Sequence, residues 1–332
     1  MSQTDENGVS LGEISEAEIL ARVFPRLPTS DSELLGPGDD AAVIAAPDGR
    51  YVVTTDMMVE GPDFRLDWST PFEIGFKAAA INLADVAAMG ARPTALVVAL
   101  GARSSTPVTV LEQIADGLRA ACEQLAPGCG VVGGDLSSAP ALVLSIAAHG
   151  DLAGHDPITR SGAQPGDVVA VAGELGLAGL GLGLLFEHGA GARDFAPIAV
   201  SAQCAPRPPI ELGVRAATAG AHAAMDVSDG LALDASRLAR ASNVRINLSR
   251  EALAEFVDPL RAARGSATKT DSELFAYVLY SGESHAILAS FSREAVPEGF
   301  TPIGSVATPE GEAIVTLDGE VIDPRGWHPF AY

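Results

Sequence analysis

Aspartate residues recur beside glycine, serine and threonine at the ends of apolar segments. They lie in five places, at residues 38–41, 54–56, 82–85, 133–135 and 226–230. Carboxylate, hydroxyl and carbonyl oxygens are the hard ligands that Mg²⁺ prefers, and Mg²⁺ is usually shared between carboxylates and the phosphates of a substrate. Carboxylates that converge without a cation would repel one another. The pattern therefore predicts that these segments either bind cations or lie apart.

Taken singly, some of these segments are equally compatible with a structural role. Asp39 and Asp40 could be turn residues after Gly-Pro-Gly, and Asp56 could simply end a strand. Asp229 is expected to cap a helix that begins at Gly230, whatever else it does. These segments alone leave both interpretations open.

Asp85 is harder to explain as a structural residue. A helix is predicted over 71–89, and it places Lys77, Ile81 and Asp85 on one face, with Asn82 three residues before Asp85. The other residues nearby are almost all apolar, and a carboxylate buried in such surroundings needs a partner. A cation is one such partner, and a distant arginine is the alternative.

Two glycine-rich segments follow predicted strands. Gly133 and Gly134 precede Asp135, which suits either close approach of the backbone to a ligand or a plain turn. The second segment, residues 173–179, could offer backbone N–H groups to a phosphate. It does not match the G-x-G-x-x-G fingerprint, so close packing of a helix is the favoured interpretation.

The composition excludes several classes of protein. The 43 acidic and 21 basic residues give a net charge of −22, which argues against nucleic acid or an anionic membrane as a partner. Lys77 and Lys269 are the only lysines and neither follows glycine, so there is no G-x-x-x-x-G-K-[ST] phosphate loop. The three cysteines form no C-x-x-C pair, and no signal peptide or membrane span is visible, which indicates a cytoplasmic protein.

Alternating strands and helices are predicted to position these residues, in an α/β (α+β type) fold of two domains. Residues 1–12 form a tail, residues 13–150 an N-terminal domain and residues 151–332 a C-terminal α/β domain. The N-terminal domain is expected to have a sheet covered on one face, with helices at 13–25, 71–89 and 107–125 and strands at 51–56, 94–100, 130–135 and 141–149. In the C-terminal domain we expect strands at 167–172, 224–227 and 286–290, helices from 173 and over 230–242, and a Pro-rich connection at 205–210.

Several segments, taken in chain order, resemble the thiamine-monophosphate kinase family of the aminoimidazole-ribonucleotide synthetase-like superfamily. They are GPGDDAAVI (36–44), VTTDMMVEG (53–61), KAAAINLADVAAMGARP (77–93), VVGGDLSS (131–138), TRSGAQPGD (159–167), AMDVSDGL (224–231) and SGE (281–283), with a tryptophan near the C-terminus. The resemblance spans nearly the whole chain after residue 13. It implies a two-domain fold whose N-terminal sheets pair across a homodimer, with residues 13–150 as the ATP- and Mg²⁺-binding and dimerisation domain.

The resemblance also implies a reaction and a set of site residues. The reaction is transfer of the γ-phosphate of ATP to thiamine monophosphate, giving thiamine diphosphate and ADP. By motif position, the ligands of several Mg²⁺ ions would be Asp40, Thr54, Thr55, Asp56, Asp85, Asp135, Asp226 and Asp229. ATP would contact Gly134, Asp135, Arg160 and Ser228, and the substrate would contact Asp63, Glu283 and Trp327, the last two at its thiamine end.

The chemistry of phosphoryl transfer agrees with this set. The acceptor is a phosphate with a second pKa of about 6, so it is largely ionised at pH 7 and no general base is required. The repulsion between two polyanions must be overcome, and several Mg²⁺ ions suit that task, with Arg160 as charge stabiliser. Trp327 could stack on the cationic thiamine ring or could be a packing residue.

Two positions depart from the family pattern. Asp63 stands where the family usually has a histidine, and Ser281-Gly282-Glu283-Ser284 stands where it has Gly-Gly-Glu-Asp. The alternatives are another ATP-dependent enzyme of the superfamily, or a non-catalytic paralogue that binds nucleotide or thiamine phosphate. The proposed metal ligands are all present, which favours the kinase.

Overall fold

Packing contacts in a computed structural model divide the chain into two units. The residues described are 9–36, 42–309, 311 and 314–327. The first unit runs up to Leu83 and includes Pro93–Asp151, and the second comprises Ala84–Arg92 and the chain from Leu152 onward. The segment 84–92 belongs to the second unit because Gly213 packs directly on the backbone of Ala87, where an added Cβ would lie 2.1 Å from the carbonyl oxygen.

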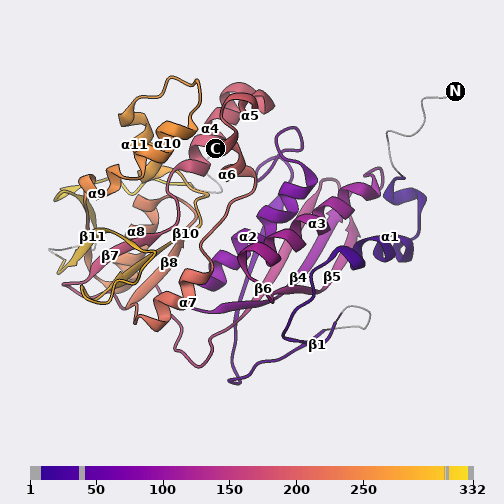
Figure 1. The fold of residues 1–332 in the computed structure, drawn as a ribbon, viewed down its shortest axis with the longest axis horizontal. Coiled ribbons are helices and arrows are strands. Elements are labelled where there is room, and N and C mark those ends of the chain that lie inside the picture. The colour runs from indigo at the N-terminus through magenta and orange to yellow at the C-terminus, as the bar shows by residue number, and fades with distance from the viewer. Residues whose placement is uncertain (1–8, 37–41, 310, 312–313, 328–332) are drawn as a thin grey trace. The chain divides into compact units, whose positions relative to one another are not determined.

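The first unit is built on a four-stranded sheet in the order β3-β6-β4-β5. The strands are β3 (Val52–Val59), β4 (Arg92–Ala102), β5 (Gly130–Ser138) and β6 (Val143–Asp151). Helices α2 (Pro71–Ala88) and α3 (Val108–Leu125) lie across one face of the sheet, as the sequence predicts (Figure 1). The helix predicted at 13–25 is instead three short helices, η1 (Leu11–Glu13), α1 (Glu16–Val23) and η2 (Phe24–Arg26), and a small hairpin follows, β1 (Glu33–Leu35) with β2 (Val43–Ile44).

The face of this sheet away from the two helices carries exposed side chains. Along β3, Val53, Thr55 and Met57 are exposed, whereas the alternate residues are more buried. Val53 and Met57 have 58% and 61% of their surface exposed. The sheet is therefore half-covered, with apolar side chains on its open face.

The second unit contains a seven-stranded sheet in the order β13-β12-β9-β11-β7-β10-β8. The strands are β7 (Val168–Ala172), β8 (Ala223–Val227), β9 (Arg245–Leu248), β10 (Ala286–Phe291), β11 (Thr301–Ala307), β12 (Val315–Leu317) and β13 (Glu320–Val321). The pairs β10–β7, β10–β8, β11–β7 and β11–β9 are antiparallel, and β12 is parallel to β9. The predicted strands at 167–172, 224–227 and 286–290 are confirmed.

Most helices of the second unit were not predicted from the sequence. The predicted ones are α4 (Leu177–His188) and α8 (Leu231–Ser242); the others are η3 (Gly189–Gly191), α5 (Ala192–Phe195), α6 (Pro197–Cys204), α7 (Glu211–Thr218), α9 (Arg250–Ala254), α10 (Val257–Ala263) and α11 (Asp271–Tyr280). They are short, so each offers too few turns for a clear apolar period. No helix in the described part of the chain is long and apolar enough to cross a membrane.

Glycines allow α2 and α3 to pack closely over the first sheet. A Cβ on Gly117 would lie 2.0 Å from the carbonyl oxygen of Phe72, and one on Gly75 would lie 2.1 Å from that of Ile114. Backbone atoms cannot move aside as a side chain can, so the two helices could not approach this closely with larger residues.

We expect Gly117→Ala to destabilise the protein, although alanine is the better helix former. The steric conflict should lower the free energy of unfolding by about 1–3 kcal/mol, measured by urea denaturation. Gly191→Ala is the matched control, because an added Cβ there meets nothing within 4 Å. An unchanged urea midpoint for Gly117→Ala would contradict the packing argument.

Candidate functional site

The predicted ligands of β3 lie on two faces of the first sheet. Successive side chains of a strand alternate between faces, so Thr54 and Asp56 point to the helix-covered face and Thr55 to the open face. The backbone N–H of Asp56 donates to Oδ1 of buried Asn82 at 3.0 Å, and Nδ2 of Asn82 donates to the carbonyl of Ala78 at 2.9 Å. Helix α2 thereby fixes the Asp56 backbone, and only Thr54 and Asp56 share a face.

Gly133 and Gly134 have different roles in β5. A Cβ on Gly134 would lie 2.0 Å from the carbonyl oxygen of Val98 on the neighbouring strand, so this glycine is required by sheet packing. A Cβ on Gly133 would meet nothing within 4 Å, so Gly133 is the one that borders open space. Asp135 is exposed and its Oδ2 accepts a hydrogen bond from the Ser137 hydroxyl at 2.9 Å.

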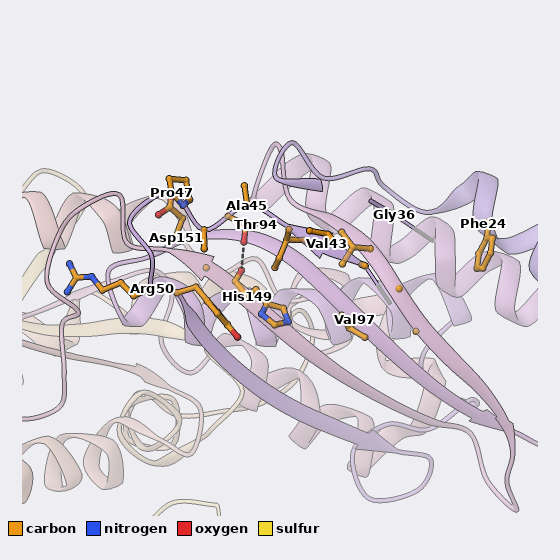
Figure 2. Close-up of a pocket in the computed structure, with 18 of the residues that line it drawn as sticks. Phe24, Gly36, Val43, Ala45, Pro47, Arg50, Thr94, Val97, His149 and Asp151 are labelled. Carbon is orange, nitrogen blue, oxygen red and sulfur yellow. Dashed lines mark hydrogen bonds between the residues drawn. The ribbon is translucent and has the colours of Figure 1, made fainter. Parts of the chain in front are cut away.

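A cavity of about 890 Å³ lies in the first unit, beside these glycines (Figure 2). Its size falls within the range of about 300–1,000 Å³ that is typical of ligand pockets. Its lining includes Tyr51, Thr94, Gly133, Gly134 and His149. The Thr94 hydroxyl donates to the carbonyl of His149 at 3.1 Å, and the rings of Tyr51 and His149 lie 5.5 Å apart. Burial lowers the pKa of His149, which favours a neutral ring in this cavity.

Two other predicted site residues belong to the first part of the chain, Asp40 and Asp63. Asp40 lies outside the described residues, as does Asp39. Asp63 closes the turn after β3, because its Oδ2 accepts from the N–H of Val59 at 2.7 Å while its own N–H donates back to the Val59 carbonyl at 3.1 Å. The Asp63 carboxylate thus has a structural partner within its own turn.

The second unit brings four predicted site residues together at the end of β8. The carbonyl of Ser228 accepts the N–H of Glu283 at 2.8 Å, and the carbonyl of Asp229 accepts the N–H of Trp327 at 2.8 Å. A Cβ on Gly282 would lie 2.3 Å from the Ser228 oxygen, so this approach requires glycine. The residues implied for ATP and metal therefore lie next to those implied for the thiamine end.

A buried histidine joins a predicted metal ligand to a predicted substrate contact. Nδ1 of His285 lies 3.4 Å from Oδ2 of Asp226, and Nε2 lies 3.8 Å from Oε2 of Glu283. Burial lowers the pKa of His285, but the two carboxylates raise it by more, to about 9. Glu283 and His285 both have positive φ, +67° and +47°, which is rare outside glycine and costly. This strained loop holds the His285 imidazole between two acids, close enough for ion pairs although neither ring nitrogen makes a hydrogen bond to a described residue.

The carboxylate of Asp229 does not cap helix α8, contrary to the prediction. The N–H groups of Asp229 and Gly230 instead donate to Oδ2 of Asp234, at 3.0 and 3.1 Å. Asp234 is fully buried, and burial raises its pKa to about 6. Arg237 donates to Oδ1 of Asp234 at 2.7 Å and also to the Asp229 carboxylate. The Asp229 side chain therefore faces an arginine, and neither Arg237 nor Asp234 was predicted.

Ser284 stabilises the glycine-rich turn before α4. Its hydroxyl accepts a hydrogen bond from the N–H of Gly176 at 3.3 Å. A Cβ on Gly176 would lie 2.8 Å from the backbone nitrogen of Val278, and one on Gly179 would lie 2.1 Å from the Cβ of Ser281. The interpretation of residues 173–179 as helix-packing glycines is confirmed.

A second cavity, of about 430 Å³, lies beside this turn in the second unit. It is bordered by the start of α4, by α6 and by the segment Ala205–Arg207. Its polar lining includes Glu174, Ser201, Arg207, Glu283 and Ser284. A largely apolar lining that includes two acids, Glu174 and Glu283, can accept a cationic aromatic ring.

The remaining predicted residues lie at other points of the second unit. Arg160 is exposed on the loop before β7, whose Thr159 carbonyl accepts the N–H of Ala224 at 2.9 Å. Ser228 lies four residues after Ala224, which corresponds to about 13 Å along a strand at 3.3 Å per residue. Asp85 lies near the end of α2 and is half-buried. Among the described residues, no group of three or more acidic, histidine or cysteine side chains is placed to hold a metal ion alone.

We expect the stabilising contribution of His285 to decline as the pH rises from 6.5 to 9. Below pH 6.5 the ring is protonated in both the folded and the unfolded chain, so its ion pairs contribute fully. Between the two pKa values only the folded chain holds the proton, so stability is lost with rising pH. Urea unfolding of the wild type and His285→Gln without divalent cations, from pH 6 to pH 10, measures the difference.

Exposed His188, with His188→Gln, provides the control for this measurement. A difference between the wild type and His285→Gln that stays constant across the pH range would contradict the raised pKa.

Comparison with known proteins identifies the family. Models described as AIR synthase related protein, N-terminal domain and C-terminal domain, match residues 38–152 and 164–315. The thiamine-monophosphate kinase of Mycobacterium tuberculosis is 44% identical, over 97% of this chain and 93% of that protein. The Corynebacterium glutamicum thiamine-monophosphate kinase is 37% identical, over 98% and 96%.

Solved structures agree with these relatives. Thiamine-monophosphate kinase from Stenotrophomonas maltophilia is 31% identical with a TM-score of 0.76, covering 95% of this chain and 99% of that chain. AaThiL complexed with AMPPCP and TMP is 29% identical with a TM-score of 0.73, covering 84% and 87%. The resemblance and the two-domain fold predicted from the sequence are thus confirmed, and the chain belongs to the thiamine-monophosphate kinase family.

Proposed function

We propose that this chain transfers the γ-phosphate of ATP to thiamine monophosphate in a Mg²⁺-dependent reaction, giving thiamine diphosphate and ADP. The observation that carries the proposal is the pair of backbone hydrogen bonds from Glu283 to Ser228 and from Trp327 to Asp229. They place residues suited to a thiamine ring beside residues suited to a nucleotide and its cation. A phosphoryl donor and its acceptor must be held in this way for direct transfer.

Phosphoryl transfer from ATP to thiamine monophosphate requires mainly that the protein position two anions. The acceptor phosphate needs no general base because its second pKa is about 6. Trp327 is 48% exposed, so a face of its ring is available to a cationic heterocycle, and Glu283 lines the neighbouring cavity with an acid. Arg160 is the exposed cation proposed to stabilise charge on ATP.

The oxygen atoms of the proposed ligands suit Mg²⁺. Asp226 has 5% of its surface exposed, and Asp229 lies three residues further along the chain. Thr54 and Asp56 share one face of the first sheet. These are hard oxygen ligands, and the phosphates and water would complete the coordination. Mg²⁺ at such carboxylates neutralises phosphate charge and acts as a Lewis acid.

We assign the two cavities to the two substrates. The 890 Å³ cavity, with Gly133 open toward it and Gly134 in its wall, is proposed for ATP. The 430 Å³ cavity, with Glu283 at its edge, is proposed for the thiamine end. Asp63 is proposed to act on substrate binding through its turn, since its carboxylate already bonds the Val59 N–H.

We also propose that the chain is a homodimer formed through the open face of the first sheet. Exposed Val53 and Met57 make this face apolar, as expected of a surface that another sheet covers.

Asp135→Asn should abolish turnover while leaving the protein folded. Asparagine has nearly the same shape but cannot supply the charge that Mg²⁺ requires, so we expect kcat to fall at least about 100-fold. The assay follows ADP and thiamine diphosphate by chromatography, with and without a chelator. Near-normal activity of the variant would overturn the metal assignment.

Asp67→Asn is the matched control for this loss. Asp67 is exposed and pairs with Arg65, so we expect its activity to stay within about twofold of the wild type. A wild-type protein that binds Mg²⁺–ATP but forms no product would instead identify a non-catalytic binder.

The double variant Val53→Glu with Met57→Glu should be a monomer. Burying two carboxylates in an apolar interface costs far more than the association can supply. Light scattering after size exclusion should give one chain mass, against two for the wild type. Leu66→Glu, also at an exposed apolar residue but outside the sheet, should remain dimeric. A wild-type monomer at micromolar concentration would refute the dimer.

A further inference from the structure

The loop that carries Arg160 is held by one side chain from a distant part of the chain. Ser242, the last residue of α8, donates its hydroxyl proton to the Arg160 carbonyl at 2.9 Å. The hydroxyl oxygen of Ser242 also accepts hydrogen bonds from the N–H groups of Gly162 at 3.2 Å and Ala163 at 3.1 Å. A serine hydroxyl offers one proton and two lone pairs, so Ser242 uses its full hydrogen-bonding capacity on this loop.

The loop has no regular structure of its own at these residues, so its position depends on the Ser242 contacts and on the Thr159 hydroxyl, which donates to the Ser161 carbonyl at 2.7 Å. Gly162 has a φ of +133°, and a Cβ there would lie 2.2 Å from the His222 carbonyl. On either side the loop is fixed at Thr159, through Ala224, and at Gln164, whose N–H donates to Asp167 at 2.9 Å. Between these points, the Ser242 hydroxyl bonds the backbone of Arg160 itself.

Helix α8 connects this loop to Asp229, another residue of the second unit that is proposed to act on ATP or its cation. The helix begins just after Asp229, and Arg237 on its surface bonds the Asp229 carboxylate. Its 12 residues span about 18 Å. One helix therefore contacts Asp229 near its start, through Arg237, and Arg160 at its end, through Ser242.

We propose that Ser242 is a positioning residue for ATP binding, because its three hydrogen bonds place Arg160 against the polyphosphate. This inference rests on the proposed function, which assigns Arg160 to ATP. Without the hydroxyl, the Arg160 backbone loses a donor and two N–H groups of the loop lose their acceptor. The guanidinium then spends less time in the orientation that the phosphates need.

A double-mutant cycle in the full-length protein tests this role. We expect Ser242→Ala to weaken Mg²⁺–ATP binding, measured by calorimetry, about five- to twentyfold, with KM for thiamine monophosphate changed less than twofold. In an Arg160→Ala background, Ser242→Ala should have no further effect, because the group it positions is gone. Ser242→Thr keeps the hydroxyl and should restore binding to within about threefold.

Ser236→Ala is the matched control on the same helix. Ser236 is buried and its hydroxyl donates to the Leu233 carbonyl at 2.7 Å, away from the Arg160 loop. The inference would be overturned if Ser242→Ala weakened Mg²⁺–ATP binding by the same factor with and without Arg160. It would also be overturned if Ser236→Ala and Ser242→Ala weakened that binding equally. Wild-type turnover judges the proposed kinase activity separately, since the binding cycle can be completed whether or not product forms.

Discussion

Two adjacent backbone carbonyls, those of Ser228 and Asp229, are the acceptors on which the site of the second unit depends. They bind the N–H groups of Glu283 and Trp327, which come from segments more distant in the sequence. Both contacts require glycine beside them: a Cβ would lie 2.3 Å from the Ser228 oxygen at Gly282 and 2.4 Å from the Asp229 oxygen at Gly326. Because only backbone atoms make these bonds, the four residues are held in place without the use of their side chains.

Electrostatic repulsion is the second constraint on this site. A chain with a net charge of −22 that gathers acids at one strand end must compensate them locally. His285 lies between Asp226 and Glu283, and Arg237 bridges Asp229 and Asp234. Each pair of acids thus has one basic group between them. The second unit can hold these carboxylates in place before any cation binds, which lowers the cost of forming the site.

The elements that could be predicted from the sequence are those with strong apolar periodicity, and the site residues that could be predicted are those within recognisable motifs. Helices α2 and α3 and the strands of the first sheet have long apolar patterns, and they are confirmed. The cap at Asp229 was wrong because its carboxylate bonds Arg237 instead, and α8 begins after Gly230 without a side-chain cap. Gly134 was singled out, but only backbone coordinates show that Val98 explains it and that Gly133 borders the cavity. His285 and Arg237 could not be found by spacing, because their partners are set by tertiary packing.

The two departures from the family pattern can be explained from their neighbours. Ser284 accepts the Gly176 N–H and so takes part in holding α4. Asp63 accepts the Val59 N–H and closes the turn after β3. Both side chains make local contacts that shape the backbone around the site. The proposed recognition of the thiamine end uses the Glu283 carboxylate and the Trp327 ring. Their backbone positions are set by Ser228 and Asp229, so an altered side chain at residue 63 or 284 leaves that anchoring intact.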